Sequence, residues 1–509
     1  MRGNAIEATQ PAHASLATWA GFGALCLGMF MAILDVQVVV TSLSVIQVAL
    51  DIGADRMSWV QTSYLIAEII AIPLTALLTR VFSMRLLFAG ATVVFTLASI
   101  ACAASFDFTS MIIARTVQGF AGGILIPLVF AAVFLLFPKS QEAVATTTGG
   151  MLAVLAPTLG PLAGGWITEN LSWHWLFLIN VIPGIAALVV GLLYLPRAKP
   201  VLRELRYLDW TSLIALAGGL AAFQIGLKNA PEDGWLSIYV LPCLVLFVVL
   251  GALFLLRGLK REHPIVELRL FADRTFLTGC IMSFVLGAGL FGSVYLLPVF
   301  LAFVRGHGPL AIGVIMLVTG VAQMISAPLA VQLERRSDER WLAGVAFAIF
   351  GIGLWMSSSS TIETDYDEMF WPQIVRGVGV TLCLLAPTRL ALGHLPISRV
   401  NDGSSLFNLM RNLGGAIGIA LIDTVLFTRT PDYADSLLER LKAGDPEAAR
   451  ITGITLEGNN FEDPVSLMTI MGDIEVAALT LAANDAWMLL AIITFAAIAA
   501  LLLAPRKSP

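Results

Sequence analysis

The sequence predicts an all-α membrane protein with fourteen transmembrane helices, arranged as two six-helix halves plus two inserted helices. Composition is the first observation, since 58% of the 509 residues are apolar and only 13% are charged. Soluble domains carry roughly 45–50% apolar and about 25% charged residues. The other two observations are the spacing of the apolar runs and an internal repeat. The composition excludes a disordered chain, a basic nucleic-acid binding protein and a disulfide-stapled secreted domain.

Apolar runs long enough to cross a bilayer predict the fourteen helices. A helix needs about 20 apolar residues to span ~30 Å of hydrocarbon. The predicted spans are 17–40, 58–79, 86–104, 110–137, 145–167, 175–195, 209–227, 236–256, 275–301, 309–332, 341–357, 370–392, 403–427 and 482–504. Most connecting segments are short, so neighbouring helices are expected to be antiparallel.

Basic residues predict the orientation, because loops rich in lysine and arginine stay in the cytoplasm. With the N-terminus inside, most of the 30 lysines and arginines fall on the cytoplasmic side, including clusters at 197–206, 257–274 and 335–340. Both termini of this multi-pass protein are therefore expected in the cytoplasm, with the chain in the cell inner membrane. The first span lacks a clear cleavage site, so we interpret it as a retained helix and not a signal peptide.

An internal repeat relates the two halves. Arg115 and Pro127 in the fourth span match Arg376 and Pro387 in the twelfth, and LGPLAG in the fifth span matches LGGAIG in the thirteenth. Two six-helix halves alone would place these partners two spans earlier, so two helices are inserted between the halves. Secondary transporters are often built from such repeats, although glycine-rich spans also resemble each other by composition alone. The predicted divisions are an N-terminal tail at 1–16, a first half at 17–196, the inserted helices with basic linkers at 197–274, a second half at 275–504 and a C-terminal tail at 505–509.

The segment 428–481 differs from the other connections. It is polar, acidic and without a long apolar run, which predicts an extracytoplasmic loop within the second half. Residues 436–442 could form a short amphipathic helix there. The loop could dock an extracytoplasmic partner or form a solvated cap.

Four motifs in the first half carry a family resemblance. They are Leu34-Asp35 before a β-branched run, Arg115-Thr-Val-Gln118-Gly119, the segment from Ala156 to Gly165, and the segment from Trp173 to Asn180. Together they resemble motifs of the fourteen-span drug–proton antiporters of the EmrB/QacA type, within the major facilitator superfamily. The resemblance implies the major facilitator fold, alternating access, and a proton gradient as the energy source without a bound cofactor. In relatives of the EmrB kind, a periplasmic adaptor and an outer-membrane channel continue the path.

The connection between the second and third spans departs from that family's pattern. Relatives usually carry Gly-x-x-x-Asp-Arg-x-Gly-Arg in a loop that is thought to latch the outward-facing state. Here Ala76 and Ser83 stand at the glycine positions, Arg80 is present and the acid is missing.

Ionisable residues within the spans are candidates for proton coupling, because a charge at mid-bilayer costs at least ~2.5–3.5 kcal/mol. Asp35 is the first candidate, with Arg115 as a cation that could switch it; the alternative is a static buried pair. Glu68 could be a neutral core residue, titrate during transport, or meet a cationic substrate. Asp423 could couple or be a solvated interfacial carboxylate, and Arg411 is expected to pair with an unidentified group.

Substrate-path and packing residues complete the candidate site. The path candidates, each of which could instead be a packing or lipid-facing residue, are Phe30, Gln37, Phe130, Phe291, Tyr295, Gln323, Met324 and Phe407. The antiporter motif offers small and helix-bending residues for close packing between helices, or for a pivot and seal between the halves. These residues are Pro157, Gly160, Pro161, Gly164 and Gly165.

These observations favour a proton-driven exporter of amphipathic organic compounds, a multidrug efflux antiporter associated with drug resistance. One charge crossing 100 mV supplies ~2.3 kcal/mol, and the chain has no phosphate-binding loop for ATP. An exporter dedicated to one metabolite (an antibiotic, a fatty acid or a siderophore) is the alternative. A non-transporting sensor is more remote. So is an enzyme, since the five histidines are scattered and no metal-ligand spacing occurs. The expected partners are the substrate, protons and lipid, with no nucleic acid.

Overall fold

The computed structural model describes residues 13–40, 42–51, 59–201, 209–261, 266–456 and 464–503. Within these ranges the chain is helical and contains no strand. Thirteen of the described helices are long and apolar enough to cross a membrane, and one of them contains two predicted spans. Each of the fourteen predicted spans therefore coincides with helix over most of its described residues. The predicted tail 505–509 and most of the predicted tail 1–16 lie outside the described residues.

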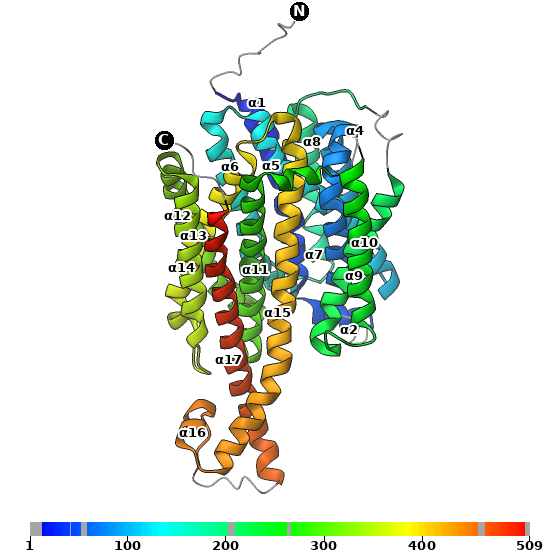
Figure 1. Cartoon of the computed structure of the whole chain (residues 1–509). Helices are drawn as coiled ribbons and strands as arrows, with labels where there is room; N and C mark the ends of the chain where they lie inside the picture. The colour runs from blue at the N-terminus through cyan, green and yellow to red at the C-terminus, as the bar shows by residue number, and fades with distance from the viewer. Residues whose placement is uncertain are drawn as a thin grey trace, which may run out of the picture.

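The first half runs from α1 to α8 (Figure 1). Its helices are α1 (Leu16–Val40), α2 (Leu43–Ala49), α4 (Trp59–Ala103), α5 (Phe108–Leu136), α6 (Lys139–Asn170), α7 (Trp175–Leu178) and α8 (Val181–Tyr194). Helix α4 combines the second and third predicted spans, and Ser83 interrupts it with φ 68° and ψ 154°. L-residues other than glycine rarely adopt this conformation, so a serine at the family's usual glycine position keeps a glycine-like backbone.

The second half repeats the helix pairings of the first. Its elements are η2 (Leu268–Ala272), α11 (Arg274–Phe303), α12 (Pro309–Arg336), α13 (Glu339–Met356), η3 (Ser357–Ser359), α14 (Tyr366–Leu392), η4 (Ile397–Arg399), α15 (Val400–Lys442), α16 (Pro446–Thr452), α17 (Pro464–Ala496) and η5 (Ala497–Leu502). Helix α1 packs on α6 and α4 on α5, while α11 packs on α15 and α12 on α14. Between the halves, α6 contacts α12 and α15 contacts α4.

The two inserted helices form a hairpin against both halves. Helices α9 (Trp210–Asp233) and α10 (Val240–Lys260) pack on each other, and α9 also contacts α4 and α15. Arg257 on α10 binds both carboxylate oxygens of Asp209, which caps α9. At the far end of the hairpin, the indole N–H of Trp235 donates to the Thr424 hydroxyl on α15 at 3.2 Å.

The segment 428–481 is largely helical, so the expectation of a long loop there is wrong. Helix α15 continues to Lys442, α17 already begins at Pro464, and α16 lies between them. Figure 1 shows α15 and α17 extending together beyond the other helices, with α16 at the tip. Leu437 and Leu441 lie one turn apart and pack with Ile470 and Ile474, forming a small core outside the bundle. Polar composition concealed this amphipathic spacing.

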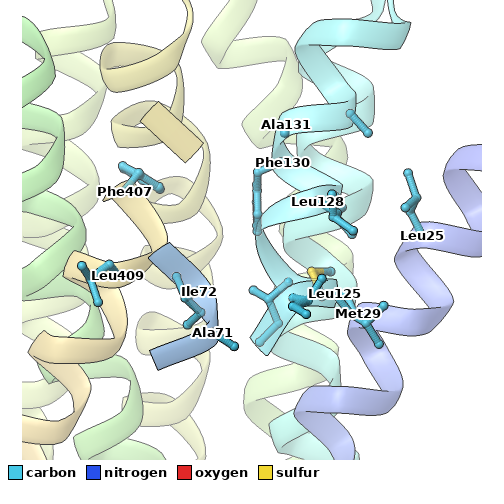
Figure 2. Close-up of a cluster of buried hydrophobic side chains, with 14 of the residues drawn as sticks. Leu25, Met29, Ala71, Ile72, Leu125, Leu128, Phe130, Ala131, Phe407 and Leu409 are labelled. Atoms are coloured by element: carbon cyan, nitrogen blue, oxygen red, sulfur yellow. The ribbon is translucent and has the colours of Figure 1, made fainter. Parts of the chain in front are cut away.

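The bundle has two ends that matter for function. The terminal side is the end where α1 begins and α17 ends. The opposite end, where α15, α16 and α17 project, is called the hairpin side; this name refers to the projecting helices and not to the inserted hairpin of α9 and α10. Figure 2 shows apolar side chains of α1, α4, α5 and α15 gathered in one cluster, with Phe130 and Phe407 from different halves. This shared core holds the two halves together toward the terminal side.

Candidate functional site

A cavity of about 290 Å³ lies between the two halves. Helices α1, α4, α5 and α6 of the first half, α11, α14 and α15 of the second, and the inserted helix α9 all contribute to its wall. Most lining side chains are apolar, as expected for a site that accepts an organic ligand. The polar and aromatic residues that line it are Gln37, Gln61, Thr62, Glu68, Gln224, Lys228, Phe291, Tyr295, Arg411, Asn412 and Asp423.

Glu68 and Arg411 face this cavity from opposite halves. Glu68 is buried on α4, and within the described chain no side chain donates a hydrogen bond to its carboxylate. Arg411 on α15 donates to the Asn408 amide oxygen and lies over the Phe130 ring at 5.1 Å. The two charges interact electrostatically. The Arg411 guanidinium therefore interacts with the Asn408 amide, the Phe130 ring and the charge of Glu68.

Asp423 and Tyr295 form the second polar group of the cavity. The Tyr295 hydroxyl on α11 donates to Asp423 Oδ1 on α15 at 2.6 Å. Both residues line the cavity, so Asp423 lies inside the bundle, not at a solvated interface. One predicted coupling residue and one predicted path residue are thus joined directly.

Lys228 on α9 is a cavity residue that the sequence reasoning missed. The predicted span ended at residue 227, which placed this lysine in an outer loop. In the structure it lines the cavity, with its ammonium 5.0 Å from the Trp59 ring centre. The helix containing it runs on to Asp233, and this additional length is what brings Lys228 inside.

Asp35 and Arg115 form a buried ion pair away from the cavity. Arg115 Nη1 donates to Asp35 Oδ2, and Arg115 Nε donates to the Val60 carbonyl at 3.0 Å. Gln118 and Asn180 donate to Asp35 Oδ1 at 2.8 and 2.6 Å. Two of the four motifs quoted for the resemblance, Arg-x-x-Gln-Gly and the segment ending at Asn180, therefore meet at the carboxylate of a third, Leu34-Asp35.

An ion pair joins the halves at the terminal side. Arg80 Nη1 at the end of the first segment of α4 contacts Asp402 Oδ1 at 2.9 Å and Oδ2 at 2.8 Å on the first turn of α15. Nearby, the Ser404 hydroxyl donates to the Pro127 carbonyl at 3.0 Å. The acid that is missing from the connection between the second and third spans is thus supplied by the other half.

Comparison with known sequences identifies the family. The family model described as Major Facilitator Superfamily matches residues 25–419. The chain belongs to the Major Facilitator Superfamily. It is 37% identical over 486 residues to the colistin resistance protein EmrB of Acinetobacter baumannii, covering 94% of both chains. It is 30% identical over 468 residues to the multidrug export protein EmrB of Escherichia coli, covering 91% of both.

Solved structures show the same fold. The human organic anion transporter MFSD10 superposes with a TM-score of 0.58 at 12% sequence identity, covering 95% of this chain and all of that one. The predicted all-α fold with two halves and inserted helices is confirmed. As a member of this superfamily the chain is a membrane transporter and not an enzyme, as the sequence predicts.

Within this superfamily fold, five of the eight predicted path residues do not line the cavity. Phe130 and Phe407 are buried in the apolar core shared by the halves, and Phe30 packs against a core cluster next to Asp35. Met324 is 43% exposed on the outer surface of α12. Gln323 lines a separate, smaller void. Helices that are apolar all round carry no signal for which face is inward.

The antiporter motif lies at close contacts between helices. All five motif residues are buried in α6. A Cβ on Gly160 would lie 2.3 Å from Gln37 Cβ on α1, and one on Gly313 of α12 would lie 2.5 Å from Leu162 Cα. The first contact lies within the first half and the second joins the two halves. The motif thus packs α6 at once against a cavity helix and against the opposite half.

Proposed function

We propose that this transporter exports amphipathic organic compounds in exchange for protons, and that the cavity between the halves binds them. The observation that carries the proposal is one mostly apolar cavity with two carboxylates, Glu68 and Asp423, at the interface of the halves. An apolar wall favours the hydrophobic part of such a ligand, and the carboxylates provide sites for a proton or a cationic group. The names of the EmrB relatives, which are resistance and export proteins, support the same substrate class.

Alternation between two openings follows from the contacts between the halves. The shared apolar core and the pair of Arg80 with Asp402 close the terminal side, while the cavity residues Gln37, Lys228 and Asp423 lie on the hairpin-side halves of their helices. Breaking the pair would allow the cavity to open at the terminal side. With both termini in the cytoplasm, export requires the cavity to load in that state and to release on the hairpin side.

Asp35 contributes to coupling through its pairing with Arg115. In the closed arrangement the arginine and two amides hold the carboxylate. Movement of α1 relative to α5 would separate the pair and leave a carboxylate that takes up a proton instead. Asp35 would then act away from the bound substrate, and Glu68 and Asp423 would act beside it.

We propose the projecting helices as the contact surface for an extracytoplasmic adaptor protein. Helices α15, α16 and α17 have their own apolar core and extend beyond the bundle. Their exposed faces carry acids, including Asp432, Asp435, Glu439 and Glu475. An adaptor with a basic contact face would fit this surface.

Efflux from cells tests the transport proposal. A host without its own pumps expresses the wild type, Glu68→Gln, Asp35→Asn and Met324→Ala, and ethidium efflux is followed with and without a protonophore. We expect protonophore-sensitive efflux from the wild type and from Met324→Ala, which alters an outward-facing residue. Loss of efflux is expected for the two acid variants at equal membrane abundance. Equal efflux from all four, with or without the protonophore, would refute both the coupling and the assigned residues.

A further inference from the structure

Unpartnered polar atoms gather between α6, α12 and α14, away from the cavity described above. Gln323 is only 3% exposed, yet neither its Oε1 nor its Nε2 has a hydrogen-bond partner. The hydroxyl oxygens of Thr146 and Thr147 on α6 are equally buried and unpartnered. All three side chains line one void, together with Thr381 of α14. Buried polar groups almost always have hydrogen-bond partners, so we expect a bound molecule in this void to supply the missing ones.

The void has the size and lining for water. Its volume is about 10 Å³, which approaches the space that one water molecule needs. The amide of Gln323 offers two donors and an acceptor, and each threonine hydroxyl both donates and accepts. One water can therefore satisfy several of the unpartnered atoms at once. Because α6 belongs to the first half and α12 and α14 to the second, this water would bridge the halves.

A charged cluster lies on the same three helices toward the terminal side. Glu334 on α12 is 5% exposed, and its Oε1 pairs with Nη1 of Arg389 on α14. Glu334 Oε2 and Arg389 Nε are buried without a partner. Glu142 on α6, 9% exposed, interacts electrostatically with both residues from the opposite half. One carboxylate therefore pairs with the Arg389 guanidinium, and a second interacts with it electrostatically across the interface.

Helical spacing places the void and the cluster on one continuous seam. Thr146 follows Glu142 by four residues on α6, and Gln323 precedes Glu334 by eleven residues, about three turns, on α12. Thr381 precedes Arg389 by eight residues, close to two turns, on α14. Each helix thus presents its void residue and its charged residue on nearly the same face. The polar face runs from the terminal side toward the middle of the bundle.

The three charged groups of the cluster, Glu142, Glu334 and Arg389, carry one net negative charge, which one proton would neutralise. Of the other charged groups nearby, Lys139 on α6 and Arg335 on α12 are exposed, and Glu339 on α13 is half-buried. Arg389 can neutralise one of the two buried carboxylates, and a proton on the other would neutralise the cluster. Protonation of either carboxyl would remove its negative charge, which is the costliest part of burying a carboxylate oxygen without a partner, such as Glu334 Oε2.

We propose that Glu142 and Glu334, held around Arg389, form a proton-binding site at the terminal side, linked by water to the void at Gln323. The proton reaches a carboxylate oxygen from the hairpin side, through the cavity and the water-filled void, whose linings share Leu384. It leaves to water on the terminal side, so one proton crosses the membrane in each cycle. Separation of α6 from α12 and α14 would move Glu142 away from Arg389. This movement would change the electrostatic environment of the carboxylate that binds the proton. The site therefore senses whether the halves are together, and it rests on the proposed proton-coupled function.

Transport with the purified protein in liposomes tests the site. The variants are Glu142→Gln and Glu334→Gln, with Glu169→Gln as a control that removes an equal charge from an exposed residue at the other end of α6. Ethidium is the probe in two assays, net transport driven by an imposed pH gradient and ethidium–ethidium counterflow without a gradient. Counterflow needs no net proton movement, so it reports folding, binding and alternation between the two openings without proton coupling. One coupled proton supports about tenfold accumulation per pH unit.

We expect both glutamine variants to keep counterflow and to lose about tenfold in gradient-driven accumulation per coupled proton and pH unit. The control should retain both activities. Full gradient-driven accumulation by both glutamine variants, beside a gradient-driven wild type, would overturn the site and leave the proposed function intact. A wild type that ignores the gradient would instead overturn the proposed function. If Glu334→Gln loses counterflow through misfolding, Glu142→Gln decides alone, because it leaves the pair of Glu334 with Arg389 in place.

Discussion

The ion pair of Arg80 with Asp402 sets how strongly the terminal side stays closed. Arg80 Nη1 contacts both carboxylate oxygens, and the two side chains are 34% and 6% exposed. Exposed pairs contribute about 0.2–1 kcal/mol, whereas breaking a fully buried pair costs about 3–5 kcal/mol. A pair with one partner a third exposed lies between these limits, at about 1.5 kcal/mol. Asp402→Asn should therefore raise the population open at the terminal side about tenfold.

Spin-label distances measure that population. Leu86, after the kink in α4, and Ile397, before α15, are exposed residues of opposite halves near the pair. Both become labelled cysteines in a background without the five native cysteines, and the distance distribution is compared with and without Asp402→Asn. We expect a longer distance to gain population in the variant, and the exchange of Arg80→Asp with Asp402→Arg to reverse that gain. Identical distributions for the parent and Asp402→Asn would refute the assigned latch.

Three further predictions concern packing and stability. Gly160→Ala should destabilise the protein by about 1–3 kcal/mol through overpacking against α1, whereas Gly90→Ala, with open space around it, should be neutral; thermal unfolding in detergent compares them. Ser83→Gly should raise the unfolding temperature, because glycine adopts this left-handed backbone without strain of roughly 1–3 kcal/mol; an unchanged or lower temperature would contradict this. The hydrogen bond from Arg257 lowers the pKa of Asp209 from 3.8 to about 2. The stability that this pair adds is therefore present above the ordinary pKa and is lost as the pH falls toward about 2, and Asp209→Asn should remove that acid dependence of thermal unfolding.

Hydropathy was sufficient for the membrane-spanning part of the fold. Apolar length found every span, and the interruption between the second and third spans appears in the structure as the kink at Ser83. Outside the membrane the same criterion failed, since α15 and α17 continue as polar helices. There the informative signal was the four-residue spacing of Leu437 with Leu441 and of Ile470 with Ile474. A search for long apolar runs alone does not detect it.

The candidate site was predictable where a charge stood inside an apolar run. Glu68 and Asp423 line the cavity for that reason, because the membrane makes such residues costly without a functional or structural partner. Lys228 was not predicted as a cavity residue because it lies at the end of a span, where hydropathy places the end of the helix too early. Asp402 was not predicted as the partner of Arg80 because the two residues are 322 positions apart in the sequence. Only the packing of the two halves brings them together.

Large apolar residues were predicted less well. Phe130, Phe407 and Met324 were plausible cavity residues by type, yet two of them fill the core and one faces outward. In a transmembrane helix apolar side chains suit the core, the lipid and an organic ligand equally. Residue type therefore cannot choose among these environments, and only the arrangement of the neighbouring helices decides.

The most direct test of the account uses the purified protein in liposomes with ethidium, an imposed pH gradient and no nucleotide. Exchange of protons for substrate predicts that wild-type protein accumulates ethidium against its concentration gradient, that ethidium addition moves protons the opposite way, and that a protonophore abolishes the accumulation. Accumulation that requires ATP, or that proceeds unchanged after the pH gradient is collapsed, would contradict it.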